Sequence, residues 1–286
     1  MSVTIDSTVT EKLQEVINIK EAIKQAIEGK GQSLDGVPFT EYDKKIAAIQ
    51  GDSSNVWANK WLPKQTSFLE FFVRLSDISD ADLSAMGFSK DNTSQVTTVR
   101  KMFDGCASLT ELPEMDLSNC TDMMRFAYGC TNLINAPDYD TRNVKSFESV
   151  FQLCRNLVRG PYWDARNVTT FASAFSWCDQ MTDMGIKNIN ANLDLSTCMV
   201  LSIESAIAIM SECRNAGAAR SIYFPRAKTD AIKSIYVRLI PITDEMRAND
   251  EFIEQKVPFE ICESTDVDAM LITVYMTSKN WTVGFA

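Results

Sequence analysis

The apolar positions between residues 96 and 190 recur at one fixed interval of 24 residues. One column of this repeat holds cysteine, and a second column, three residues further on, holds leucine. The two columns comprise Cys106, Cys130, Cys154 and Cys178, and Leu109, Leu133 and Leu157. A period of this length predicts coils that stack and share one continuous core, because a single coil cannot bury its own apolar stripe.

Each unit of the repeat is expected to contain two short elements. Leu109–Pro113 alternates apolar and polar residues and ends at a proline, which is typical of a short strand. From Thr121 to Tyr128 the apolar residues fall at helical spacing, and Gly129 follows. This pattern predicts a short helix with its N-cap at Thr121. One coil is therefore expected to run strand, turn, short helix, turn.

Two blocks of the repeat carry a family resemblance. Val99–Pro113 and Asp116–Met123 are similar to the units of BspA-type leucine-rich repeats, which have the forms "MFxGCxxLTxLP" and "DxSNVTDM". The similarity covers residues 96–213, and Lys279–Val283 resembles the closing strand of such arrays. The resemblance implies an α/β solenoid of strand-turn-helix coils, with the cysteine and leucine columns in its core.

The first 50 residues have a different apolar pattern, with spacings of three and four residues. This pattern predicts either a packed amphipathic helix or a short coiled coil, with a second helix from about Thr40. The apolar stripe expected to mediate oligomerisation is Leu13, Val16, Ile19, Ile23 and Ile27.

Part of this region resembles a segment of bacteriophage virion proteins. The stretches Ile23–Gly31 and Val37–Ile46 are similar to a segment of tail and fibre proteins of the form "IKxAIxxKG…PFxxYxxKI". The resemblance implies a virion location, contacts with other virion proteins and a homo-oligomer, which we expect to be a trimer. An ordinary helical hairpin is the alternative.

The sequence as a whole predicts four regions. Residues 1–54 form a helical anchoring segment, 55–95 an aromatic-rich cap, 96–220 the solenoid and 221–286 an extended α/β cap. Around and after the repeat, we expect a capped helical turn at 79–84, helices at 203–210, 243–255 and 269–277, and strands at 221–224 and 281–285.

Composition argues against most chemistry. The chain contains no histidine, which removes the commonest general base, the Ser-His and Cys-His nucleophile systems and a common metal ligand. The column Asp116, Asp140 and Asp164 could hold a cation, but aspartate at a turn usually accepts hydrogen bonds from backbone amides. We therefore predict no enzyme activity, no metal and no cofactor.

Charge and hydropathy limit the partners. The net charge of −10 and the lack of a basic stripe argue against nucleic acid. No apolar run is long enough to span a membrane, and the first residues do not resemble an export signal.

Binding is the remaining function. Large aromatic residues stand in repeat columns that we expect to face outward, where they could contact a host-surface protein or glycan, or pack against a neighbouring subunit. These residues are Tyr128, Tyr139, Tyr162, Trp163 and Trp177. The leading hypothesis is a non-enzymatic phage tail or head fibre located in the virion. A bacterial adhesin, an intracellular protein-binding scaffold and a sugar-cleaving tail enzyme are the alternatives.

Overall fold

The computed structural model describes Lys24 and residues 62–214, 216–241, 243, 258–266 and 268–286. The chain divides into two units, Met1–Asn55 and Val56–Ala286, and all described residues except Lys24 belong to the second. The predicted oligomerisation stripe of Leu13, Val16, Ile19, Ile23 and Ile27 lies outside the described residues, as does most of the helix expected at 243–255.

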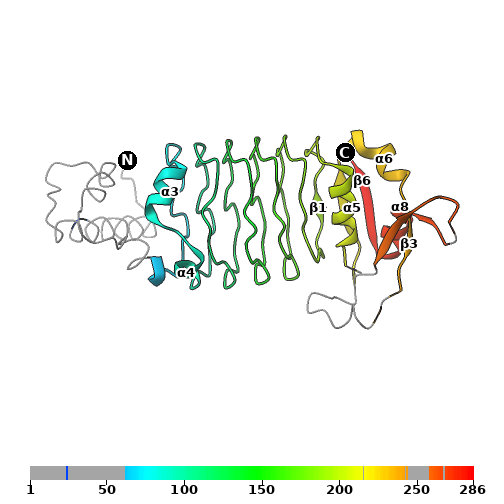
Figure 1. The fold of residues 1–286 in the computed structure, drawn as a ribbon, viewed down its shortest axis with the longest axis horizontal. Helices are drawn as coiled ribbons and strands as arrows, with labels where there is room; N and C mark the ends of the chain where they lie inside the picture. The colour runs from blue at the N-terminus through cyan, green and yellow to red at the C-terminus, as the bar shows by residue number, and fades with distance from the viewer. Residues whose placement is uncertain (1–23, 25–61, 215, 242, 244–257, 267) are drawn as a thin grey trace, which may run out of the picture. The chain divides into compact units, whose positions relative to one another are not determined.

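The second unit is a mixed α/β structure with two small sheets and short helices (Figure 1). Its helical elements are η3 (Leu62–Lys64), α3 (Asp80–Met86), α4 (Lys90–Thr93), α5 (Ile203–Ser211), η4 (Arg226–Lys228), α6 (Thr229–Lys233) and α8 (Ile272–Ser278). Its strands are β1 (Leu193–Asp194), β2 (Arg220–Phe224), β3 (Tyr236–Leu239), β4 (Phe259–Cys262), β5 (Met270–Leu271) and β6 (Trp281–Phe285).

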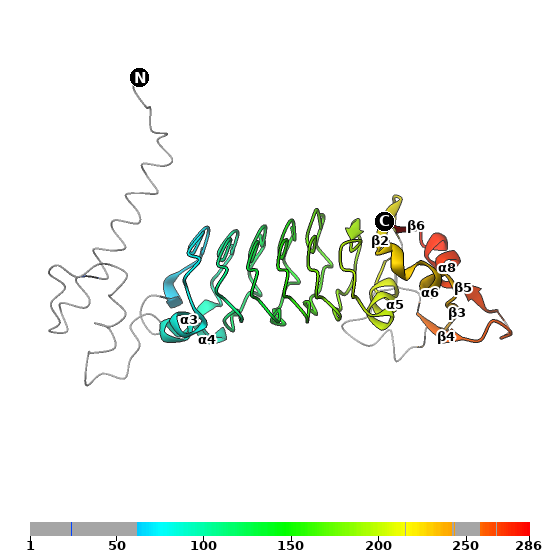
Figure 2. The ribbon, with the colours of Figure 1, turned by 90° about the horizontal axis from the view of Figure 1, so that it is seen from above.

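Between α4 and α5 the backbone forms coils that lie side by side, as both ribbon views show (Figures 1 and 2). Parallel bridges join Thr98 to Asp122, Asp122 to Ser146 and Ser146 to Thr170, so each coil lies beside the residues 24 positions further on. The repeat in the sequence therefore corresponds to a repeat in space.

The prediction of a helix inside each coil is wrong. The backbone N–H groups there donate alternately to the next coil and to carbonyls of their own coil. The N–H groups of Lys101, Phe103 and Gly105 donate to carbonyls of the next coil at 2.7–2.9 Å. The intervening N–H groups, such as that of Met102, donate three residues back within their own coil. An α-helix would direct every bond four residues back.

Positive φ angles at fixed positions make this backbone pattern possible. Lys101, Arg125, Ser149 and Ser173 share one column with φ between 53° and 56°, and Gly105, Gly129, Leu153 and Trp177 share another with φ between 65° and 81°. Thr121 is not an N-cap, because no helix follows it, and its hydroxyl donates to the Thr97 carbonyl of the preceding coil at 3.3 Å. The side chain of Asp122, rather than that of Thr121, accepts a backbone N–H two residues on, from Met124 at 3.0 Å. Nor does Leu109–Pro113 form a strand.

The stacked coils begin earlier than Val96, where the sequence places their start. The N–H groups of Glu70, Phe72 and Arg74 donate to carbonyls of the coil that follows, at 2.6–2.9 Å. Glu70 and Arg74 also have positive φ angles of 56° and 60°. The region expected to be an aromatic-rich cap therefore includes a further coil, in which Phe68 and Phe72 are buried.

Two sheets follow the coils. β1, β2 and β6 form a parallel sheet in that order, with Tyr223 of β2 opposite Gly284 of β6. β4, β3 and β5 form an antiparallel sheet. The predictions of helix at 203–210 and of strands at 221–224 and 281–285 are confirmed by α5, β2 and β6. The capped turn at 79–84 is confirmed by α3, whose Ser79 and Asp82 make a reciprocal capping box.

The core runs through the coils as columns of identical or similar side chains. All seven residues of the cysteine and leucine columns are fully buried: Cys106, Cys130, Cys154, Cys178, Leu109, Leu133 and Leu157. The buried thiols also donate hydrogen bonds to backbone carbonyls. Cys130 donates to the Phe103 carbonyl at 3.1 Å, and Cys154 donates to the Ala127 carbonyl at 3.0 Å, both in the preceding coil. Burial raises the pKa of both thiols well above its ordinary value.

Candidate binding surfaces

Two of the five aromatic residues predicted to face outward are core residues. Trp163 is fully buried, and Tyr139 is 5% exposed. The Trp163 Nε1–H donates to the Pro137 carbonyl at 2.8 Å, and the Tyr139 hydroxyl donates to the Pro113 carbonyl at 2.7 Å. Their polar atoms are therefore satisfied by backbone, and neither side chain can contact a partner.

Tyr139 and Trp163 are buried because the two residues that follow each repeat proline lie on opposite sides of the chain. The second of them belongs to a core column, in which Met115, Tyr139 and Trp163 are all buried. The first belongs to an exposed column, which includes Tyr162, 40% exposed. A column of methionine, tyrosine and tryptophan is uniformly large and apolar, and this uniformity was the signal in the sequence that marked it as buried.

Tyr162 is held firmly in place on the surface. Its hydroxyl donates to Asp183 Oδ1 at 2.5 Å, and the Arg159 guanidinium lies over its ring, 4.9 Å from the centroid. The ring also covers Gly185, where an added Cβ would come within 2.6 Å of it. Arg159 itself binds Asp138 at 2.6 Å. The hydrogen bond to Asp183, together with burial, raises the pKa of Tyr162 to about 12.

Exposed apolar side chains occur on the coil of this tyrosine and on the coil before it. Ile134 and Val158 are 44% and 42% exposed, and the Val158 N–H donates to the Ile134 carbonyl at 2.8 Å, so they lie on adjacent coils. Arg159 follows Val158 in the sequence, and its guanidinium lies over the Tyr162 ring. We call Ile134, Val158, Arg159 and Tyr162 the Tyr162 surface. Of these four, only Tyr162 was predicted from the sequence, because single exposed apolar residues give no signal in a sequence.

Trp177 is half exposed at 50% and lies at another corner of the coils. It has a φ of 65°, a conformation that is unusual for a bulky residue, and its column holds glycine in two earlier coils. The Arg155 guanidinium lies 5.8 Å from the indole centroid and binds Asp179 at 3.0 Å. Trp177 is therefore available to a partner.

Tyr128 also has an arginine over its ring. The Arg125 guanidinium lies 3.7 Å from its ring centroid, and the Arg125 Nε–H donates to Asp104 at 2.8 Å. Tyr128, Tyr162 and Trp177 thus share one arrangement, in which an arginine fixed by an aspartate covers one face of an aromatic ring. Such a ring loses little conformational freedom when it binds.

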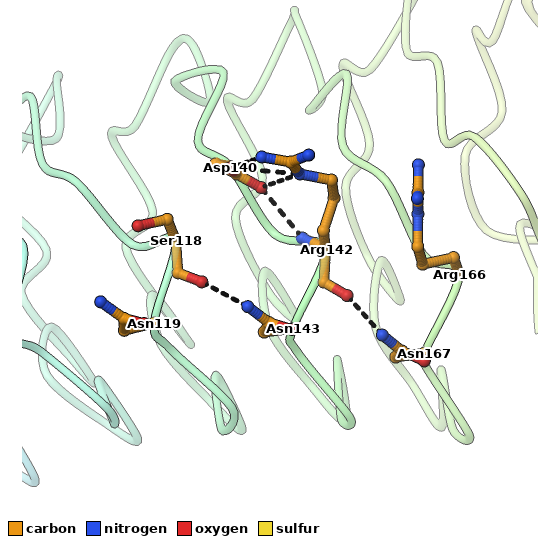
Figure 3. Close-up of a pocket in the computed structure, with 7 residues that line it drawn as sticks. All are labelled: Ser118, Asn119, Asp140, Arg142, Asn143, Arg166 and Asn167. Atoms are coloured by element: carbon orange, nitrogen blue, oxygen red, sulfur yellow. Dashed lines mark hydrogen bonds and ion pairs between the residues drawn. The ribbon is translucent and has the colours of Figure 1, made fainter. Parts of the chain in front are cut away.

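A separate polar groove crosses three coils, with a volume of about 440 Å³ (Figure 3). Its lining includes Asn119, Asn143 and Asn167, which lie in a row. Each asparagine amide donates to a carbonyl of the preceding coil at 2.7–2.8 Å. We call this feature the asparagine groove. Its other lining residues are Ser118, Asp140, Arg142 and Arg166.

The aspartate column accepts backbone amides at turns, as expected for aspartate at such positions. Asp116, Asp140 and Asp164 each accept the backbone N–H two residues on, at 2.9–3.2 Å. Arg142 and Arg166 bind Asp140 and Asp164 at 2.7 and 2.6 Å. The hydrogen bonds from Arg142 lower the pKa of Asp140. Burial acts to raise the pKa of Asp164, but hydrogen bonds from Arg166 and Asn188 outweigh it and lower this pKa.

The described residues were also searched for metal-ligand groups and for membrane-spanning helices. Among the described residues, no group of three or more His, Cys, Asp or Glu side chains is placed to hold a metal ion. Within the same part of the chain, no helix is both long enough and apolar enough to cross a bilayer.

A comparison with known protein families matches the coils. One family model matches residues 67–193. Its description is "Mycoplasma protein of unknown function, DUF285", and the match spans less than half of the 286-residue chain. The match begins at the early coil that contains Phe68, rather than at Val96. No curated protein and no solved structure matches this chain.

Proposed function

We propose that this chain is a non-enzymatic bacteriophage virion protein, a tail or head fibre, whose stacked coils bind a host-surface or virion partner. In this proposal the coils form a BspA-like leucine-rich-repeat solenoid, and residues 1–54 anchor the chain as an oligomer, with a trimer expected. The virion assignment rests on the resemblance of Ile23–Gly31 and Val37–Ile46 to phage tail and fibre proteins.

The Tyr162 surface is the observation that supports binding. It combines three exposed apolar side chains, Ile134, Val158 and Tyr162, with an arginine that is already fixed by Asp138. Binding hot spots combine aromatic and arginine side chains in this way, and a pre-ordered surface loses less entropy on association.

Virion location is tested by immunogold electron microscopy of phage particles, with antibody to this protein. Label on the tail tip or fibres would support receptor contact, and label over the capsid would indicate a head fibre. Particles without label would refute the virion proposal. The oligomer is tested by the mass of the full chain at micromolar concentration. A monomer that is unchanged by deletion of residues 1–54 would refute it.

The Tyr162 surface is tested by a polar substitution in the full chain. Val158→Ser should leave the unfolding midpoint nearly unchanged, because exposed sites usually contribute less than about 0.5 kcal/mol. It should weaken attachment to host cells or to the partner virion protein. Leu239→Ser is the matched control, since Leu239 is similarly exposed at 47% but lies on β3. Equal attachment by both variants would exclude this surface.

A bacterial adhesin or protein-binding scaffold is the alternative. The matched model describes a Mycoplasma protein and covers the coils but not residues 1–54. Protein found on bacterial cells and absent from every phage particle would establish this alternative.

A further inference from the structure

We infer that β6 is the contact strand of a two-fold dimer, in which it pairs antiparallel with the β6 strand of a second copy of this chain. This inference goes beyond the proposed function, because it uses neither residues 1–54 nor the Tyr162 surface. It depends on three properties of β6: its unpaired backbone groups, the symmetry of those groups and the lack of charge on the strand.

β6 is the last strand of the sheet β1–β2–β6, and β2 pairs with one of its two edges. The Arg220 N–H donates to the Asn280 carbonyl at 3.1 Å, and the Ala286 N–H donates to the Phe224 carbonyl at 3.2 Å. These bonds fix which residues face β2, because alternate residues of a parallel strand bond to the same neighbour. The even-numbered residues of β6 therefore face β2, and the odd-numbered residues face the other edge.

The odd-numbered residues present unpaired backbone groups. They are Trp281, Val283 and Phe285, and no described residue forms a hydrogen bond with their N–H or C=O groups. Val283 and Phe285 are partly exposed, and Thr282 between them is exposed, so solvent reaches this part of the strand. β6 thus has an edge at which a further strand can bond.

The unpaired groups of this edge are complementary to themselves. In an antiparallel pair, two facing residues can exchange both of their N–H···O bonds. With Val283 on a two-fold axis, Val283 faces its own copy, and Trp281 faces Phe285 of the second copy. Every unpaired N–H and C=O group of the two edges is then satisfied. A register centred on Thr282 or Gly284 would instead bring together groups that already bond to β2.

β6 also lacks the features that usually keep an edge strand from pairing, which are charged side chains, proline and bulges. Trp281–Phe285 contains no charged residue and no proline, whereas β4, at an edge of the other sheet, carries Glu260 and follows Pro258. Lys233 lies 5.4 Å from the ring centroid of Phe285. In the two-fold pair the two Phe285 residues lie about 14 Å apart, at opposite ends of the contact. This distance exceeds the screening length of about 8 Å at physiological salt, so the two lysines repel each other little.

Pairing at β6 would also continue the bonding that already joins the coils. Parallel bridges connect successive coils, the last of them connects Ile189 to Cys213, and the sheet β1–β2–β6 follows. Figure 1 shows β6 beside α5, where the row of coils ends. A second β6 would therefore bond at the end of this series, and the two stacks would meet end to end.

The second copy is tested by the mass of the full chain at micromolar concentration, measured by light scattering. Val283→Pro removes the central N–H of the contact but no bond to β2, because this N–H faces away from β2. We expect a mass at least twofold lower than that of the unchanged chain. Ile261→Pro is the matched control. The Ile240 N–H donates to the Pro258 carbonyl, so the Ile261 N–H likewise faces away from its neighbour β3. This control should keep the mass of the unchanged chain.

The register is tested by introduced cysteines in a Cys262→Ser chain, which lacks the one native cysteine that is not buried. Val283→Cys should form a covalent dimer with the oxidant diamide, because residue 283 faces its own copy with Cα atoms about 5.5 Å apart, within reach of a disulfide. Phe285→Cys is the matched control, since its two copies would lie about 14 Å apart and should not cross-link. Non-reducing gel electrophoresis measures both.

The inference is overturned if Val283→Pro and Ile261→Pro have the same mass, if both cysteine variants cross-link equally, or if neither does. Urea unfolding shows whether each variant folds. If Val283→Pro does not fold, the two cysteine variants decide, and cross-linking by Val283→Cys alone supports the dimer. An oligomer that survives Val283→Pro but needs residues 1–54 would leave the proposed N-terminal anchor intact, so the two contacts can fail separately.

Discussion

Replacing Trp163 tests whether the second residue after each repeat proline lies in the core, as Met115, Tyr139 and Trp163 do. The side chain is fully buried, and its ring centroid lies 5.1 Å from that of Phe147 and 5.4 Å from that of Phe151. Burial of an indole removes about 200 Å² from water, which corresponds to about 5 kcal/mol. Trp163→Ala would also remove one of the two donors to the Pro137 carbonyl and leave it with the Tyr139 N–H alone. Truncations of this kind cost about 3–5 kcal/mol, and we expect about 4 kcal/mol here.

The assay is urea unfolding of the full chain, followed by far-ultraviolet circular dichroism. Trp177→Ala is the matched control, because Trp177 is 50% exposed and its loss should cost less than about 0.5 kcal/mol. If Trp163→Ala does not fold, Trp163→Phe retains a ring and should cost about 1–2 kcal/mol through the lost hydrogen bond and reduced packing. Equal midpoints for the Trp163 and Trp177 variants would refute the core assignment and return Trp163 to the surface.

Three further predictions concern backbone, thiols and pH. Gly105→Ala and Gly129→Ala should each lower the free energy of unfolding by about 1–2 kcal/mol in urea titrations, since both have positive φ, whereas Gly217→Ala, with open space around it, should not. At pH 8 a thiol reagent should label only Cys262 rapidly, because the other seven cysteines are buried, and Cys262→Ser should remove this fast phase in a kinetic absorbance assay. Because the folded pKa of Tyr162 is raised to about 12, its stabilising contribution should be complete below pH 10 and lost as pH rises towards 12, and Tyr162→Phe should remove this part of the alkaline unfolding profile.

The sequence predicted which residues share an environment better than it predicted the backbone that carries them. A 24-residue period requires that equivalent residues occupy equivalent positions, so the burial of Cys130 and Leu133 follows from that of Cys106 and Leu109. The spacing of Met123, Phe126 and Ala127 suggested a helix. Consecutive turns that bond alternately within a coil and to the next one place the same residues inward, so hydrophobic spacing could not distinguish the two.

The candidate surface was only partly predictable. Tyr162 and Trp177 were identified from their repeat columns, but Trp163 was assigned to the wrong side because Met115 and Tyr139 were not recognised as members of its apolar column. Arg159 could not be identified, because its position over Tyr162 depends on contacts between coils. The coil at Phe68 was missed because the interval to the next coil is 31 residues rather than 24, which hides it from a search at fixed period.

This longer first interval shows that the stack of coils accommodates extra residues. The seven additional residues lie between Ile78 and Thr93, where α3 and α4 replace the usual corner, while Phe72 N–H still donates to Met102 of the following coil. The extra residues at this corner therefore leave the bonding between neighbouring coils intact. New segments inserted at the equivalent corners of later coils would be tolerated for the same reason, so whole binding loops could be added to this scaffold, by natural recombination or by design, without rebuilding its core.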